Sequence, residues 1–110
     1  MEKYHNAEAG IEQRVEDLLP RMTIEEKIAQ LGSCFADVLL DHGVWDTGKA
    51  REVLAQGIGH ISAIARSSAL AARELAGLAN NVQRYLIEQT RLSIPAIIHE
   101  ECLNGFRYAQ

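Results

Sequence analysis

The segment IPAIIHEECLNG, residues 94–105, decides how the rest of the sequence is interpreted. It begins with a short apolar run, residues 94–98, whose length is typical of a strand covered on both faces. The run changes abruptly to His99, Glu100 and Glu101, which marks the point where the strand leaves the core. In parallel α/β folds, ligands bind at the carboxyl ends of the strands, so we expect a binding site there.

A βαβ unit is predicted around this segment, with residues 94–99 as its second strand. Residues 58–64 form a short isoleucine-rich run, which predicts the first strand. Residues 71–89 predict the connecting helix, because apolar side chains recur there at helical spacing: Leu75, Leu78, Ala79, Val82 and Leu86. A crossover of this length predicts parallel strands. Two strands alone do not make a stable covered sheet, so we expect the chain to begin a larger α/β domain.

Two further helices are predicted before this unit. Residues 1–10 are polar and are interpreted as a loose leader, and residues 11–22 show helical spacing that Pro20 is expected to end or kink. Thr23 and Glu26 fit a capping box for the second helix. The apolar residues of this helix share one face, namely Ile24, Ile28 and Leu31. Gly32 is placed to end the helix.

The middle of the chain gives weaker signals. Residues 35–40 fit either a short strand or a helical turn, residues 41–43 a turn, and residues 49–56 a short helix. Gly57 and Gly59 are interpreted as a helix stop and a site of close strand packing. They precede a strand, whereas the glycines of a phosphate-binding loop follow one.

Composition narrows the classes of function. With 110 residues, 47% hydrophobic and 24% charged, the chain fits one globular domain at most. A net charge of −4 gives no electrostatic argument for nucleic acid or a membrane surface, and 5% aromatic residues weigh against a stacking surface for bases or sugars. No apolar run approaches the roughly 20 residues that span a bilayer. Without a signal peptide we expect a cytoplasmic protein, unless its true start lies upstream.

Metal binding and paired-carboxylate catalysis are both considered for the charged end of the segment. A helical zinc motif needs a second histidine four residues after His99, where Leu103 stands, so we predict no metal site. Neighbours on a strand point to opposite faces, so Glu100 and Glu101 cannot flank one glycosidic bond. At most one of them faces a site, and the alternative is that both are solvated loop charges.

Cys34 and Cys102 are interpreted as free thiols, because two isolated cysteines without a signal peptide are a poor disulfide framework. Cys102 is interpreted as a packed thiol and not as a nucleophile, since His99 is its only neighbouring base. We predict no cofactor.

Three blocks of the sequence resemble family 3 glycoside hydrolases, the group of β-glucosidases and β-xylosidases. RVEDLLPRMTIEEKIAQL, residues 14–31, is very similar to the opening signature of that family. GIGHI, residues 57–61, resembles its first barrel strand. LANNVQRYL and TRLSIPAIIHEECLNG, residues 78–86 and 90–105, resemble the next helix and the second strand. The blocks keep the order and spacing of the family, and the resemblance covers residues 11–110.

The resemblance implies an α/β fold in which residues 11–110 begin a (β/α)8 barrel of the TIM type. It implies a retaining hydrolase that acts on β-linked glucosides or xylosides from their non-reducing ends. Counting back from Gly105 places Glu101 where the family has an acidic residue, often Asp, that binds sugar hydroxyls. The nucleophile and general acid of the family would lie beyond Gln110, so this chain alone is expected to catalyse nothing.

A second hypothesis is a small helical interaction domain without enzymatic activity. Such a domain would bind a partner through the apolar stripe of residues 11–31 or of residues 75–86, although such stripes usually form core. The two hypotheses differ in whether the sequence continues past Gln110 into a barrel.

Overall fold

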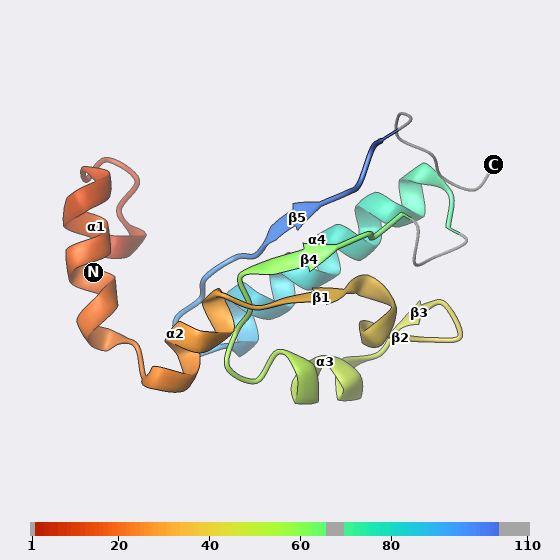
Figure 1. Cartoon of the computed structure of the whole chain (residues 1–110), viewed down its shortest axis with the longest axis horizontal. Coiled ribbons are helices and arrows are strands. Elements are labelled where there is room, and N and C mark those ends of the chain that lie inside the picture. The colour runs from red at the N-terminus through yellow and green to blue at the C-terminus, as the bar shows by residue number, and fades with distance from the viewer. Residues whose placement is uncertain (1, 66–69, 104–110) are drawn as a thin grey trace.

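A three-stranded parallel sheet forms the centre of the fold (Figure 1). The computed structural model describes residues 2–65 and 70–103 of the chain. The sheet consists of β1 (Ser33–Phe35), β4 (His60–Ser62) and β5 (Ile97–His99), in that spatial order. Order in space therefore follows order in sequence, and each new strand is added on the same side. Residues 104 and 105, the end of the segment that opened the sequence analysis, lie outside the described residues.

Helices and a small hairpin complete the described structure. The α-helices are α1 (Ile11–Leu18), α2 (Ile24–Gln30), α3 (Thr47–Val53) and α4 (Ala72–Gln89). The 3-10 helices are η1 (Lys3–His5), η2 (Leu19–Arg21) and η3 (Ala36–Leu39). The hairpin pairs β2 (Leu40–Asp41) with β3 (Val44–Trp45) in antiparallel fashion. The turn predicted at residues 41–43 is confirmed, since His42 and Gly43 connect these strands with φ angles of 46° and 81°.

The predicted βαβ unit is confirmed, with strands shorter than expected. β4 and β5 pair in parallel, with Ile61 beside Ile98, and α4 connects them. Leu78, Val82 and Leu86 of α4 belong to the same buried cluster as Ile61. Gln83 adds polar contacts, because its side-chain amide donates to the Ala96 carbonyl at 2.8 Å and accepts from the Ala96 amide at 3.0 Å. α4 thus covers one face of the sheet and holds the start of the last strand.

The sheet has one strand more than the sequence predicted. β1 pairs in parallel with β4, so that Cys34 lies beside Ile61. The segment that resembles a first barrel strand is therefore the second parallel strand, and β5 is the third. Residues 36–39 form η3, so the helical turn is the correct alternative for most of residues 35–40. The signal for β1 was weak because the strand has only three residues and depends on pairing with β4.

The helix pair at the start of the chain forms as predicted. α1 ends at Leu18 and Pro20 lies in η2, while the capping box of α2 has both of its hydrogen bonds. The Glu26 amide donates to Thr23 Oγ1 at 3.2 Å, and the Thr23 amide donates to the Glu26 carboxylate at 2.8 Å. The interpretation of residues 1–10 as loose is wrong at Tyr4, which is buried and donates its hydroxyl to the Leu92 carbonyl at 3.2 Å.

Most of the apolar stripe of residues 11–31 is exposed, although Met22 is buried and Leu18 is partly buried. Ile11 is 74% exposed, Ile28 64% and Leu31 88%. α1 lies apart from the sheet, at the left of Figure 1. The expectation that this stripe forms core therefore fails among the described residues, whereas the stripe of α4 is buried.

Close packing at Gly59 joins α2 to the sheet. The Gly59 amide donates to the Ala29 carbonyl, and a Cβ atom at Gly59 would lie 1.9 Å from the Gln30 carbonyl oxygen. Gly57 has a φ of 78° and follows α3. The interpretation of Gly57 as a helix stop is confirmed. Gly59 is a site of close packing as expected, but its close neighbour is the end of α2 and not a strand.

Candidate functional site

The carboxyl ends of the three parallel strands meet at one edge of the sheet. Phe35 pairs with Ser62, and Ser62 pairs with His99, so these three residues form the last row of the sheet. A cavity of about 240 Å³ opens at this edge. Its lining comes from all three residues of β1, from the last residue of β4 and from the residue two positions beyond β5: Ser33, Cys34, Phe35, Ser62 and Glu101. The cavity lies where the sequence predicted a binding site.

Glu101, the predicted substrate-binding residue, is exposed and lines this cavity. A carboxylate at this position can accept hydrogen bonds from two neighbouring hydroxyl groups of a ligand. Ser33 and Ser62 add hydroxyl groups that both donate and accept. Among the described residues that line the cavity, Glu101 is the one carboxylate. The arrangement therefore supplies hydrogen bonds for binding, without the acid–base pair that glycoside cleavage requires.

Glu100 and Glu101 have different environments. The backbone amide of Ala65 donates to the Glu100 carboxylate at 2.5 Å, across 35 residues of sequence. The carboxylate of Glu100 therefore holds the segment after β4, while that of Glu101 lines the cavity. This separation agrees with the prediction that at most one of the two faces a site. The alternative that both are solvated loop charges is wrong for Glu100.

The segment after β4 is held at a second point. The Ala63 amide donates to the His99 carbonyl at 3.0 Å. Ala63 is buried and has a φ of 54°, a region that residues with a Cβ seldom adopt. The contacts with His99 and Glu100 offset the cost of this conformation, so the carboxyl ends of β4 and β5 are fixed relative to each other.

His60 and His99 lie near each other on the sheet, with ring centroids 5.7 Å apart in an edge-on arrangement. His99 is exposed and does not line the cavity. Within residues 2–65 and 70–103, no group of three or more His, Cys, Asp or Glu side chains is arranged to hold a metal ion.

Both cysteines are free thiols, as predicted. Cys34 lines the cavity and packs partly against the core. Burial raises the pKa of the Cys34 thiol, and the nearby charge of Asp37 raises it further. Cys34 is therefore protonated near neutral pH and is a weak nucleophile. Cys102 is exposed, so its interpretation as a packed thiol is wrong.

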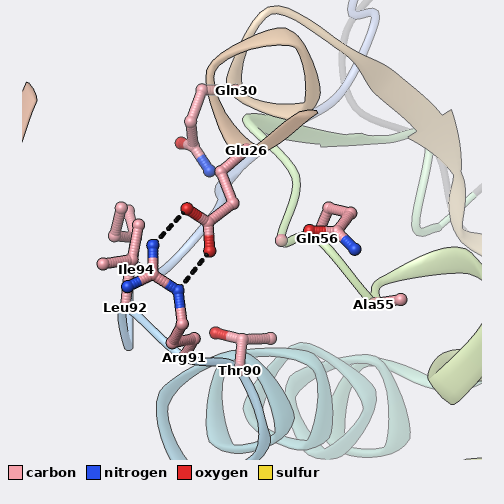
Figure 2. Close-up of a pocket in the computed structure, with 9 residues that line it drawn as sticks. Glu26, Gln30, Ala55, Gln56, Thr90, Arg91, Leu92 and Ile94 are labelled. Atoms are coloured by element: carbon pink, nitrogen blue, oxygen red, sulfur yellow. Dashed lines mark hydrogen bonds and ion pairs between the residues drawn. The ribbon is translucent and has the colours of Figure 1, made fainter. Parts of the chain in front are cut away.

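A second, much smaller cavity lies at the opposite, amino-terminal side of the sheet (Figure 2). Its volume of about 10 Å³ is just enough to admit one water molecule. Figure 2 shows Glu26 and Arg91 pointing toward each other beside it, with two hydrogen bonds of 2.9 and 2.5 Å. The side chain of Arg91 holds the pKa of the buried Glu26 below its usual value, against the opposing effect of burial. This pair is structural, since both oxygens of the carboxylate are occupied.

Four lining residues of the larger cavity were not predicted from the sequence, namely Ser33, Cys34, Phe35 and Ser62. Their signal is weak because three of them belong to β1, which the sequence did not define. Ser62 is the last residue of β4, and its place at a strand end is the only feature that could have marked it.

The chain is similar in sequence to proteins named as β-xylosidase or β-glucosidase. It is 36% identical over 110 residues to a "Putative beta-xylosidase" of Formosa agariphila, in a match covering 93% of this chain and 14% of that protein. It is also 36% identical over 109 residues to "Probable beta-glucosidase C" of Aspergillus flavus and of Aspergillus oryzae, covering 94% of this chain and 17% and 16% of those proteins. These similarities indicate a glycosidase-like origin.

The chain spans only 14–17% of the length of these relatives. No model of a known protein family matches it. Among the described residues, no helix is long and apolar enough to cross a membrane.

Proposed function

We propose that this chain is the N-terminal part of the catalytic barrel of a β-glycosidase that resembles family 3, and that Glu101 binds the sugar. The complete enzyme would be a retaining hydrolase of β-linked glucosides or xylosides, acting from their non-reducing ends. Its nucleophile and general acid would come from elsewhere in the enzyme. The similarity to proteins named β-xylosidase and β-glucosidase over more than nine-tenths of this chain supports the proposal.

The order of the strands is the one that a (β/α)8 barrel requires. In a barrel, strands that follow one another in sequence lie next to each other, whereas a doubly wound sheet reverses its order at a switch point. The order β1-β4-β5 has no reversal, which fits a barrel and also fits the first three strands of a doubly wound sheet. Exposure of Phe35 (49%) and Ile97 (61%) shows that one face of the sheet lacks a cover among the described residues. That face would line the interior of the proposed barrel.

The observation that carries the proposed role of Glu101 is its place in the cavity at the carboxyl ends of the strands. Two hydrogen bonds from neighbouring sugar hydroxyls to one carboxylate would hold the ring in a fixed orientation for attack by a nucleophile. Glu100 is the weaker candidate for this role, because one oxygen of its carboxylate already accepts from the Ala65 amide.

The experiment that tests this function is hydrolysis of aryl β-xylosides and aryl β-glucosides by the complete protein. We expect turnover of at least one of them, and an anomeric product with retained configuration. Absence of hydrolysis of either substrate by correctly folded protein would contradict the proposal.

The alternative hypothesis of a non-enzymatic interaction domain now depends on the apolar stripe of α1 and α2. The residues 75–86 stripe is buried, and the structure holds a parallel sheet, so a purely helical domain is wrong. The exposed stripe on α1 and α2 keeps a non-enzymatic binding role open as a second candidate. Two observations would favour this role. The 110 residues would unfold in one sharp thermal transition as a monomer, and the reading frame would not continue into a barrel.

A further inference from the structure

A second open groove lies on the helical side of the sheet, away from Glu101. Its volume is about 340 Å³, within the range of small-molecule sites. Its lining includes Trp45 of β3 and five residues of α4: Asn81, Arg84, Tyr85, Glu88 and Gln89. It shares no lining residue with the Glu101 cavity.

The groove follows from the geometry of α4. Positions 81, 84, 85 and 88 have the spacing i, i+3, i+4 and i+7, so they share one face of the helix. That face is adjacent to the buried stripe of Val82 and Leu86, which packs on the sheet. The buried stripe therefore fixes α4 in a rotation that presents these polar side chains to the groove.

Two aromatic rings meet at this groove. The ring centroids of Trp45 and Tyr85 are 6.0 Å apart, with an angle of 57° between the ring planes. Both side chains are half-buried and pack against the core, so their orientation is fixed before any ligand arrives. Although the low aromatic content weighed against a stacking surface, the single tryptophan of the chain lies next to one of its three tyrosines.

The polar lining carries no net charge and has unused hydrogen-bonding capacity. Arg84 and Glu88 contribute one charge of each sign. In the part of the chain that the structure describes, the side chains of Asn81, Arg84, Glu88 and Gln89 make no hydrogen bond or ion pair. An uncharged ligand with many hydroxyl groups and apolar C–H faces matches this combination, because hydroxyls pair with amides and charged groups while C–H faces pack on aromatic rings.

We propose that this groove binds a β-linked oligosaccharide chain at a second site, separate from the Glu101 cavity. The choice of a carbohydrate rests on the proposed glycosidase function, since the same lining also suits other neutral polyhydroxy ligands. The site would hold a longer substrate against the outer surface of the enzyme and would take no part in bond cleavage.

Calorimetric titration of xylohexaose and cellohexaose into the complete protein tests the proposal. A Glu101→Gln background, expected to lower kcat/KM about 100-fold, slows consumption of the probe at the first site. The test variant is Asn81→Ala with Arg84→Ala, and the matched control is Asn80→Ala with Arg73→Ala, at exposed positions of the same helix that do not line the groove. We expect about fivefold to tenfold weaker binding of at least one hexasaccharide to the test variant, from the loss of two or more hydrogen bonds, and unchanged binding to the control.

Absence of hexasaccharide binding, or equal binding by the test and control variants, would overturn this inference. In the wild-type background, hydrolysis of short aryl glycosides should be the same in both variants. Failure of the proposed glycosidase function would appear separately, as absence of aryl glycoside hydrolysis by the wild-type protein. The binding of hexasaccharide by the test and control variants could still be compared in that case.

Discussion

The carboxylate of Glu26 and the guanidinium of Arg91 form a two-point ion pair, although 65 residues separate them in the sequence. The same carboxylate accepts from the Thr23 amide at 2.8 Å, and Arg91 also donates to the Arg21 carbonyl at 2.8 Å. One buried acid therefore caps α2 and joins it to the segment after α4 (Figure 2). The pair fixes the first helices against the βαβ unit.

We predict that Glu26 makes the stability of the protein depend on pH in the acid range. Because its pKa is lowered in the folded state, folding is favoured at pH values above the unfolded pKa of about 4.3, and that contribution is lost as pH falls through the folded pKa. Urea unfolding of wild-type and Glu26→Gln protein at pH 7 and pH 3 measures this. The variant should be less stable at pH 7 by about 1–2 kcal/mol, an amount discounted because Arg91 is half exposed, and the difference should shrink at pH 3. An equal difference at both pH values would contradict the assignment.

We predict that Gly59→Ala destabilises the fold by about 3 kcal/mol, because the new methyl group would overlap the Gln30 carbonyl and neither backbone segment can move freely. Gly77→Ala is the matched control. Gly77 lies inside α4, and a Cβ atom there would meet no neighbouring atom within 4 Å, so alanine should stabilise the helix by about 0.5–1 kcal/mol. Thermal unfolding of the two variants should shift in opposite directions, and equal shifts would refute the close contact.

We predict that Gln83→Ala destabilises the protein by about 2 kcal/mol, since it removes both hydrogen bonds to the backbone of buried Ala96. Gln13→Ala, at an exposed position of α1, should change stability by less than about 0.5 kcal/mol. Chemical denaturation gives both values. Similar effects of the two substitutions would show that Gln83 does not hold the start of β5.

The sequence predicted those parts of the fold that local rules determine. The capping box at Thr23 and Glu26 needs only residues three apart, and the stripe of α4 needs only helical periodicity. β1 was not predicted, because a strand of three residues is too short to show an alternation of apolar and polar side chains. Its stability comes from pairing with β4. The exposure of most apolar side chains of α1 and α2 was also missed, because periodicity identifies an apolar face without specifying what covers it.

The candidate site was predicted in part. The charged end of residues 94–105 indicated a strand end. Strand alternation was the reason given for separating Glu100 from Glu101, and the two do have different environments, but both lie beyond β5 and not on a strand. The bond from the Ala65 amide to Glu100 spans 35 residues, and the bonds from Arg91 to Glu26 span 65, so no local pattern could reveal either. The meeting of Trp45 with Tyr85 likewise depends on how the hairpin packs on α4.

We predict that Cys102 reacts with a thiol reagent about tenfold or more faster than Cys34. Cys102 is exposed, while burial raises the pKa of Cys34 and reduces its thiolate fraction at pH 8. Reaction with a disulfide reagent, followed by absorbance, measures the two rates. Cys102→Ser should abolish the fast phase, and Cys34→Ser should leave it intact. The reverse pattern would contradict the assignment of Cys102 as the exposed thiol and Cys34 as the more buried one.

The most direct test of the proposed role of Glu101 is the kcat/KM of Glu101→Gln in the complete protein on aryl β-xyloside and β-glucoside substrates. Glu25→Gln, at an exposed position of α2, is the matched control and should behave as wild type. Loss of charge from an acceptor of two sugar hydrogen bonds predicts a decrease of about 100-fold or more for Glu101→Gln, with the thermal midpoint unchanged. A kcat/KM equal to that of the wild type on both substrates would remove Glu101 from the sugar-binding site.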